Sequence, residues 1–199
     1  MQPTRNLSYR QLNAQLNADT PATWLLYKEK LKGKHPNMQS MQKILLIEPQ
    51  KCAGCRTCEA ICSFHHEKEF NPAKSRIHVL KQDEAGLDVP TVCLQCDVPA
   101  CEKSCPKKAI SRSLKSGAVT IDYELCTGCN LCAEACPYGR ITIDVNKGKP
   151  AKCDLCNGKP ACVEFCPTGA IAFAAATKNN LSKRNAAIKL EKSAKSPYK

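Results

Sequence analysis

Apolar residues in the middle of the chain occur in short runs, most of which alternate with polar residues. Residues 44–47 form a continuous apolar run, while residues 76–79, 119–122 and 141–144 alternate between polar and apolar side chains. Residues 170–173 are again mainly apolar. Alternation with a period of two is typical of a half-buried strand, and runs of this length match short strands. The pattern therefore predicts a series of short strands, each too small to bury a core by itself.

The N-terminal region, residues 1–42, follows a different pattern and contains no cysteine. Pro21 stands at a helix-start position and Gly33 at a helix-stop position, which predicts a helix over residues 21–31. This N-terminal arm is either a strap packed on its own domain or a docking segment for another subunit, since its Trp and Tyr are residue types common at interfaces.

The C-terminal region, residues 177–199, is rich in Lys, Ala, Ser and Asn. Such a composition is typical of a solvated or disordered tail. Docking to an acidic surface of a partner is the alternative interpretation of this basic tail. We expect no binding to nucleic acid, because Tyr198 is the only aromatic residue in the tail and stacking platforms are missing.

Sixteen cysteines lie between the two ends, and their spacing repeats four times. The third group has the spacing C-x2-C-x2-C-x3-C and is followed by Pro137. The first group has Ser63 after its last cysteine, and the second and fourth groups carry insertions before their third cysteine. In chain order the groups are Cys52, Cys55, Cys58 and Cys62; Cys93, Cys96, Cys101 and Cys105; Cys126, Cys129, Cys132 and Cys136; Cys153, Cys156, Cys162 and Cys166.

Iron–sulfur ligation explains this spacing better than zinc ligation or disulfide bonding. Zinc sites usually pair two short cysteine knuckles, or one knuckle with histidines. Disulfide frameworks belong to secreted proteins, and residues 1–10 have neither an apolar run after their basic residues nor a twin arginine. Three thiolates on one tight loop hold three corners of a [4Fe-4S] cube, while the fourth cysteine ligates a neighbouring cluster in bacterial ferredoxins. Each group therefore needs a partner group.

The composition agrees with a protein that is stabilised by metal clusters. Only 5% of the residues are aromatic, so a large conventional core is not expected and the cysteines are the obvious staples. The formal net charge of +12 looks at first like that of a nucleic-acid-binding protein. An oxidised [4Fe-4S] core with four thiolates carries about −2, so four of them bring the loaded chain to about +4. Much of the basic excess thus offsets the clusters.

Other polar side chains lie next to the cysteines. His65 and His66 follow the first group, where the cysteine ligands are already complete, so we expect surface or hydrogen-bonding histidines. Four cations next to cysteines or their following prolines either tune the reduction potentials of the clusters or are ordinary solvated side chains. They are Lys107, Lys108, Arg140 and Lys152.

The order of strand, cysteine loop, helical turn, Pro and Ala-Ile recurs along the chain, as residues 105–110 and 166–171 show directly. With four such motifs, residues 43–173 resemble the four-cluster, ferredoxin-like electron-transfer subunits of molybdenum and tungsten oxidoreductases. Residues 55–65, 71–72, 75–77 and 92–96 are most similar to the small subunits of tungsten enzymes of the aldehyde oxidoreductase type, which include the iron–sulfur subunit of tungsten-dependent benzoyl-CoA reductase.

The resemblance implies an α+β fold with two tandem, bacterial-ferredoxin-like modules of two [4Fe-4S] clusters each. The four-cluster domain spans residues 43–176. One module combines residues 43–92 with residues 145–176, and residues 93–144 form the other.

The resemblance also implies which cysteines share a cluster, because the first group pairs with the fourth and the second with the third in these subunits. The spacing alone supports only the exchange of each fourth cysteine. The implied ligands are Cys52, Cys55, Cys58 and Cys166 for cluster 1; Cys153, Cys156, Cys162 and Cys62 for cluster 2; Cys93, Cys96, Cys101 and Cys136 for cluster 3; Cys126, Cys129, Cys132 and Cys105 for cluster 4.

A cluster with four cysteine ligands leaves no open position for a substrate, so we expect no catalytic residue and no enzyme activity on this chain. The resemblance implies electron transfer between a ferredoxin or flavoprotein and a larger catalytic subunit that holds tungsten or molybdenum. A free-standing polyferredoxin, or the electron-transfer subunit of a hydrogenase, formate dehydrogenase or carbon monoxide dehydrogenase, is the alternative. No apolar run approaches the length of a membrane span. We expect a cytoplasmic protein that works in an anaerobe or under anoxic conditions.

Overall fold

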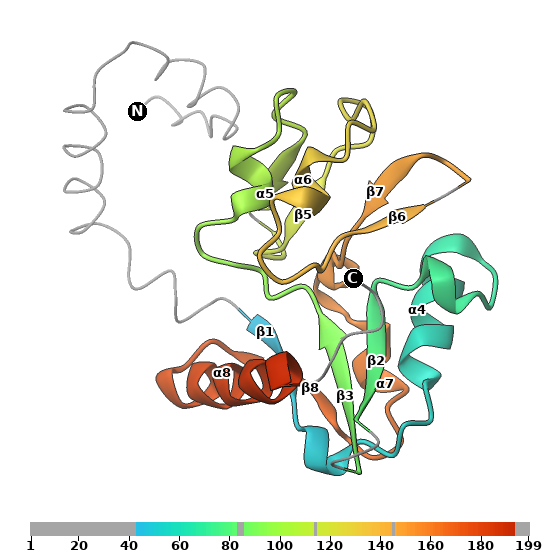
Figure 1. The fold of residues 1–199 in the computed structure, drawn as a ribbon, viewed down its shortest axis with the longest axis vertical. Helices are drawn as coiled ribbons and strands as arrows, with labels where there is room; N and C mark the ends of the chain where they lie inside the picture. Colours follow the sequence, from blue (N-terminus) through green and yellow to red (C-terminus); the bar gives the residue numbers. More distant parts are fainter. Residues whose placement is uncertain (1–42, 83–85, 114, 145, 194–199) are drawn as a thin grey trace, which may run out of the picture. The chain divides into compact units, whose positions relative to one another are not determined.

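The computed structural model describes residues 43–82, 86–113, 115–144 and 146–193 (Figure 1). The helix expected over residues 21–31 lies outside these ranges. In the described part, short strands form four separate two-stranded sheets, and short helices lie between them. This mixture of helices and small sheets is the coarse architecture that the sequence predicts.

The four sheets are antiparallel and pair segments that flank the cysteine groups. The sheet of β1 and β8 joins the first and last strands of the described region. The predicted strands are all present, whereas β3, β4 and β7 have no clear signal in the sequence. Two of these contain a proline, which removes a backbone donor and is rare inside sheets. The pairs are β1 (Lys43–Ile47) with β8 (Ile171–Ala175), β2 (Ile77–Gln82) with β3 (Leu87–Val92), β4 (Ile110–Arg112) with β5 (Val119–Ile121), and β6 (Thr142–Asp144) with β7 (Lys149–Ala151).

The helices carry the third cysteine of each group. Cys58 lies on α4 (Thr57–Glu67), which is the longest of these helices, and the other three helices have a single turn. Short 3-10 helices occur at Pro49–Lys51, Pro72–Lys74 and Leu155–Gly158. The single-turn helices are α5 (Ala100–Lys103), α6 (Leu131–Glu134) and α7 (Ala161–Glu164).

The buried apolar residues form two clusters, and cysteines belong to both. The larger cluster combines β1, β2 and β8 with cysteines of the first and fourth groups. The smaller cluster combines Ile110, Val119 and Ile141 with cysteines of the second and third groups. The core is therefore assembled around the cysteines and not beside them.

The C-terminal region differs from the expected tail. Residues Lys178–Ser193 form the helix α8, which packs against β1 and β3 (Figure 1). Ala187 is 8% exposed and belongs to the larger apolar cluster, and Arg184 donates to the carbonyl oxygen of Leu94 at 3.0 Å. The interpretation of these residues as a solvated or disordered tail is therefore wrong. The sequence does not reveal the packing, because the described residues of the helix bury only a small alanine and lack the broad apolar stripe that marks most packed helices.

Candidate metal centres

The four cysteine groups share one backbone turn. The residue directly before the second cysteine has a positive φ in every group: Gly54 (+64°), Gln95 (+51°), Gly128 (+75°) and Leu155 (+58°). A positive φ is uncommon for residues such as Gln and Leu. Its recurrence at the same position indicates that the four loops are copies of one local structure, including the two loops with insertions.

The fourth cysteine of each group receives backbone N–H groups from the chain that follows it. The N–H of Ala109 donates to Sγ of Cys105 at 3.2 Å, and the N–H of Arg140 donates to Sγ of Cys136 at 3.3 Å. Each donor lies four residues after its cysteine. N–H groups directed at sulfur stabilise the thiolate form, which is the form that binds metal.

Cys166 shows the consequence of such donors for a thiol. Burial alone raises the pKa of Cys166, but N–H groups of Ile171, Thr168 and Ala170 and the Thr168 hydroxyl act in the opposite direction. The net result is a pKa below the usual value. Cys166 therefore loses its proton more readily than an ordinary cysteine, even without a metal.

Two sheets bring cysteine groups together with the same register. In the β1–β8 sheet, Ile47 lies opposite Ile171, and these residues stand five positions before Cys52 and five positions after Cys166. In the β4–β5 sheet, Ile110 lies opposite Ile121, five positions after Cys105 and five before Cys126. The first group thus meets the fourth, and the second meets the third.

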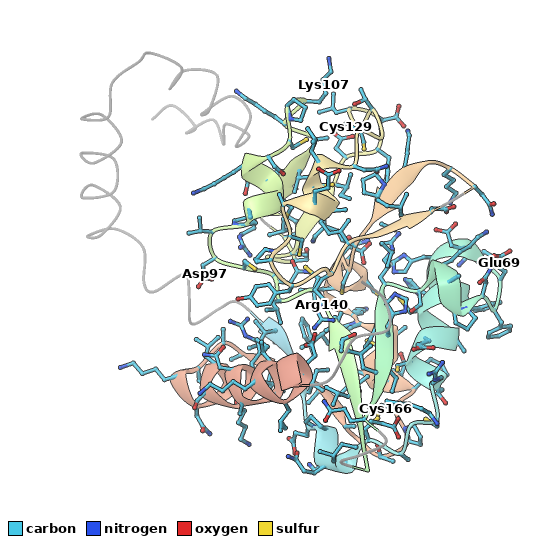
Figure 2. The ribbon with its side chains drawn as sticks, viewed as in Figure 1. Glu69, Asp97, Lys107, Cys129, Arg140 and Cys166 are labelled. Atoms are coloured by element: carbon cyan, nitrogen blue, oxygen red, sulfur yellow. The ribbon has the colours of Figure 1, made fainter. Side chains whose placement is uncertain are left out.

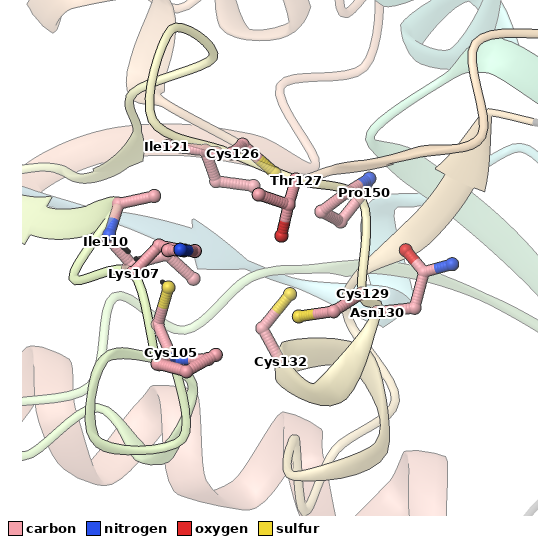
Figure 3. A pocket seen from close by; sticks show the side chains of 12 residues that line it. Cys105, Lys107, Ile110, Ile121, Cys126, Thr127, Cys129, Asn130, Cys132 and Pro150 are labelled. Carbon is pink, nitrogen blue, oxygen red and sulfur yellow. Dashed lines mark hydrogen bonds between the residues drawn. The ribbon is translucent and has the colours of Figure 1, made fainter.

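The structure gathers the cysteine sulfurs into four places, which we call sites 1 to 4. Cavities mark three of them, and Figure 3 shows the cavity of site 4. At site 1, the charges of Cys55 and Cys166 act on Cys52, and those of Cys52 and Cys55 act on Cys58. Site 1 is Cys52, Cys55, Cys58 and Cys166; site 2 is Cys62, Cys153, Cys156 and Cys162; site 3 is Cys93, Cys96, Cys101 and Cys136; site 4 is Cys105, Cys126, Cys129 and Cys132.

The residues at these sites fit a metal cluster. Burial raises the pKa of Cys58 to about 12 and that of Cys132 to about 11, so these thiols are neutral at pH 7 unless a cation replaces the proton. Iron supplies that positive charge. Arg76 and Arg140 line sites 2 and 3, and their buried Nε atoms have no hydrogen-bond partner among the described residues. Such buried donors need an acceptor, and an anionic cluster provides one.

The four cations singled out in the sequence divide into two kinds. Lys107 and Lys108 are exposed, as solvated side chains are. Lys152 is only 2% exposed, and the side chain of Arg140 is 10% exposed, so the solvated interpretation is wrong for these two. Burial lowers the pKa of Arg140 to about 10, which leaves it charged at pH 7, and it forms an ion pair with Glu191 of α8.

The two histidines behave as expected from the sequence. His65 is exposed. His66 is half-buried, and its Nε2 lies 3.5 Å from a carboxylate oxygen of Asp154 and 3.8 Å from Sγ of Cys156. Burial lowers the pKa of His66 to about 4, so the ring is neutral at pH 7. His66 is therefore a hydrogen-bonding neighbour of site 2.

Two buried polar residues received no role from the sequence. Gln95 is 2% exposed, donates to the carbonyl oxygen of Cys153 at 2.7 Å and accepts from the N–H of Val119 at 2.7 Å. Glu59 is 3% exposed and accepts from the N–H of Val79 at 2.6 Å. Gln95 ties a cysteine loop to β5, and Glu59 ties the helix α4 to β2. In the sequence, only their position next to a cysteine sets them apart. Solvated polar residues occur at the same kind of position, so the sequence does not distinguish the two.

Comparisons with known proteins agree with this chemistry. Residues 85–176 match a model described as a 4Fe-4S dicluster domain, and residues 49–64 match a 4Fe-4S binding domain. The polyferredoxin-like subunit of aliphatic sulfonate oxidoreductase from Pyrococcus furiosus is 44% identical over 110 residues, which cover 55% of this chain and 63% of the relative. The electron transport protein HydN of Escherichia coli is 38% identical over 112 residues, which cover 53% and 62%.

Among solved structures, a chain of the active-site complex BamBC of benzoyl coenzyme A reductase with bound benzoyl-CoA is 29% identical. The match covers 66% of this chain and 78% of that chain, with a TM-score of 0.39. The chain spans about six tenths of the length of the two relatives named above. Among the described residues, no helix has the length and apolar content that crossing a membrane requires.

The sixteen cysteines of this chain fit four [4Fe-4S] clusters, and residues 85–176 are similar to a 4Fe-4S dicluster domain, which is the chemistry of an iron–sulfur protein. Within this class, the chain resembles the iron–sulfur electron-transfer components of oxidoreductases, since its relatives are named as electron-transport proteins or as subunits.

Proposed function

We propose that this chain is a non-catalytic electron-transfer subunit that relays single electrons through four [4Fe-4S] clusters. The two ends of this relay are an external ferredoxin or flavoprotein and the active site of a larger catalytic subunit. A [4Fe-4S] cluster held by four cysteines exchanges one electron between its 2+ and 1+ core states. The chain itself holds the sulfur ligands, buries six of the sixteen cysteines and sets the charge around them.

The observation that carries this proposal is that the four sites follow one another in a row. The helix α4 carries Cys58 of site 1 and Cys62 of site 2. Gln95 lies in the loop of site 3 and donates to the carbonyl oxygen of Cys153 of site 2 at 2.7 Å. The helices α5 and α6, which carry cysteines of sites 3 and 4, pack against each other. These contacts support the order 1, 2, 3, 4.

The two ends of the row reach the surface. Cys55 of site 1 and Cys129 of site 4 are exposed, whereas no cysteine of sites 2 and 3 is. Figure 2 places Cys166 of site 1 and Cys129 of site 4 toward opposite ends of the described region. Exposed clusters at both ends suit a relay, because electrons enter at one end and leave at the other.

The register of the β1–β8 and β4–β5 sheets supports the two tandem modules, and the four sulfur sets support the ligand pairing that the resemblance implies. The names of the relatives support a larger oxidoreductase partner. We place a tungsten or molybdenum enzyme as that partner on the resemblance of residues 55–65, 71–72, 75–77 and 92–96, and a cytoplasmic location belongs to the same proposal.

The test is anoxic purification of the full chain with its co-purifying subunits, followed by metal analysis. We expect about sixteen iron atoms per chain, as four [4Fe-4S] clusters require, and tungsten or molybdenum in a larger chain. Four clusters without any partner would favour a free polyferredoxin, and zinc in place of iron would overturn the proposal.

Ligand pairing is tested by substitution and electron paramagnetic resonance (EPR). We expect Cys96→Ser and Cys136→Ser to alter the same cluster signal, although these cysteines belong to different groups. Cys129→Ser, in the same group as Cys136, should alter a different signal. If Cys136→Ser and Cys129→Ser change one common signal, the exchange of fourth cysteines is wrong.

A further inference from the structure

Lys152 lies between site 2 and site 3 and is almost fully buried, with 2% of its surface exposed. It lines the cavity of site 3 and directly precedes Cys153 of site 2. Its Nζ donates to the carbonyl oxygen of Val119 and, at 3.1 Å, to that of Cys153. The ion pairs found within the described ranges do not include Lys152.

A buried ammonium group without a carboxylate partner is costly, because two carbonyl dipoles do not replace its hydration shell. The anions available to it are the clusters, each of which carries a net negative charge with its four thiolates. The charge of Lys152 reaches both sites. Burial raises the pKa of Cys101 and of Cys153, and the positive charge of Lys152 opposes this rise at each of them.

Site 1 has the opposite surroundings. Glu59 is 3% exposed, and among the ion pairs of the described residues its only cationic partner is the exposed Arg56 at 4.0 Å. Its charge adds to the raised pKa of Cys58, for which burial is the largest cause. The carboxylate of Asp88 lies against the loop residue Gly54, where an added Cβ would overlap its Oδ2, and its charge acts on Cys52. Site 3 instead has Arg140 in addition to Lys152. The four sites are therefore not electrostatically equivalent.

We propose that Lys152 is a fixed positive charge shared by the clusters of sites 2 and 3, and that reduction potentials rise from site 1 towards site 3. This inference rests on the electron-transfer function proposed above. Each cluster gains one electron from the redox partner, so its total charge falls by one. A nearby cation stabilises the reduced state and raises the potential, and a nearby carboxylate lowers it.

The proposal gives the relay a direction. An electron that enters at the exposed Cys55 end moves to higher potential as it passes from site 1 through site 2 to site 3. Site 3 then acts as the electron sink of this part of the row, and site 1 serves as the acceptor for a low-potential donor.

The experiment is an anoxic redox titration of the full chain, followed by EPR. We expect Lys152→Met to lower two of the four midpoint potentials and Lys152→Arg to restore them. Lys103→Met is the matched control, because this exposed lysine lies near Cys101 and Cys105 in the chain and loses the same charge. It should leave all potentials unchanged. Equal shifts in Lys152→Met and Lys103→Met, or no shift in either, overturn the proposal.

Two further variants keep the test decisive if Lys152→Met does not assemble its clusters. Arg140→Gln should lower the potential of one cluster, and Glu59→Gln should raise the potential of a different one. Glutamine retains the oxygen that accepts from Val79. Unchanged potentials in both variants overturn the proposal. A wild-type chain with fewer than four clusters defeats the proposed function instead, so the two failures are distinguishable.

Discussion

The loop of the third cysteine group depends on the absence of a side chain at residue 128. Gly128 has φ of +75°, and a Cβ there would lie 2.8 Å from the carbonyl oxygen of Gly148. That oxygen belongs to the backbone and cannot rotate away as a flexible side chain does. Two separate requirements, a left-handed conformation and a close approach of two backbones, therefore meet at one position.

We predict that Gly128→Ala destabilises the chain by about 2 kcal/mol or more, since strain in φ and a steric overlap add together. Gly139→Ala is the control, because Gly139 also has a positive φ of +59° but no atom within 4 Å of the added Cβ. It should cost only about 1 kcal/mol, from the backbone conformation alone. Anoxic thermal unfolding measures both. Equal losses would show that the contact with Gly148 is unimportant.

Glu191 affects site 3 through Arg140, whose charge it partly neutralises. We predict that Glu191→Gln raises the reduction potential of one cluster, because the Arg140 charge is then less compensated. The expected rise corresponds to about 1 kcal/mol, or roughly 40 mV for one electron. Redox titration measures it, with Glu164→Gln as the control, because Glu164 is exposed and next to cysteines of other sites. A fall in potential would contradict this sign.

At the scale of elements, α8 shows how little apolar surface is needed to fix a helix on this core. Ala187 reaches the larger apolar cluster, whereas the neighbouring Ala186 is exposed. Two hydrogen bonds also hold the helix in place: Arg184 donates to the carbonyl oxygen of Leu94, and Gln82 donates to the carbonyl oxygen of Leu190 at 2.7 Å. The helix thereby connects the cysteine loop that begins at Cys93 with β1 and β3.

We predict that Ala187→Asp destabilises the chain by about 2 to 3 kcal/mol, because it buries a carboxylate without a partner. Ala186→Asp introduces the same side chain one residue away on the exposed face and should change stability by less than about 0.5 kcal/mol. Anoxic denaturant titration followed by circular dichroism compares the two variants. If both variants behave alike, α8 does not pack on the core in solution.

At the scale of the whole molecule, the cysteine spacing predicts most of the site. The short apolar runs predict both strands of the β1–β8 sheet and one strand of each of the other three described sheets. The strand at residues 44–47 is visible because it is continuously apolar, whereas β7 is a Lys-Pro-Ala segment without any pattern. The sequence does not distinguish the buried Lys152 from the exposed Lys107, since both lie next to a cysteine loop. Burial of Lys152 results from contacts between segments far apart in the chain, and no local pattern records such contacts.

The clusters, not the sheets, should hold this molecule together. Each described sheet has only two strands, and a two-stranded sheet is marginal in water. Both apolar clusters include cysteines, and without iron the buried charge of Lys152 loses the anions that offset it. Because a metal site that forms on folding contributes its binding energy to stability, the iron-free chain lacks its main stabilising term.

We predict that removing iron with a chelator and a mild oxidant abolishes the cooperative thermal unfolding transition and makes residues 43–193 sensitive to protease. Anoxic addition of iron and sulfide should restore both the transition and the resistance, which excludes simple damage by the treatment. Near-ultraviolet circular dichroism and limited proteolysis measure the change. An iron-free chain that unfolds cooperatively within a few degrees of the loaded chain would mean that the apolar clusters suffice, and that the cysteines serve electron transfer alone.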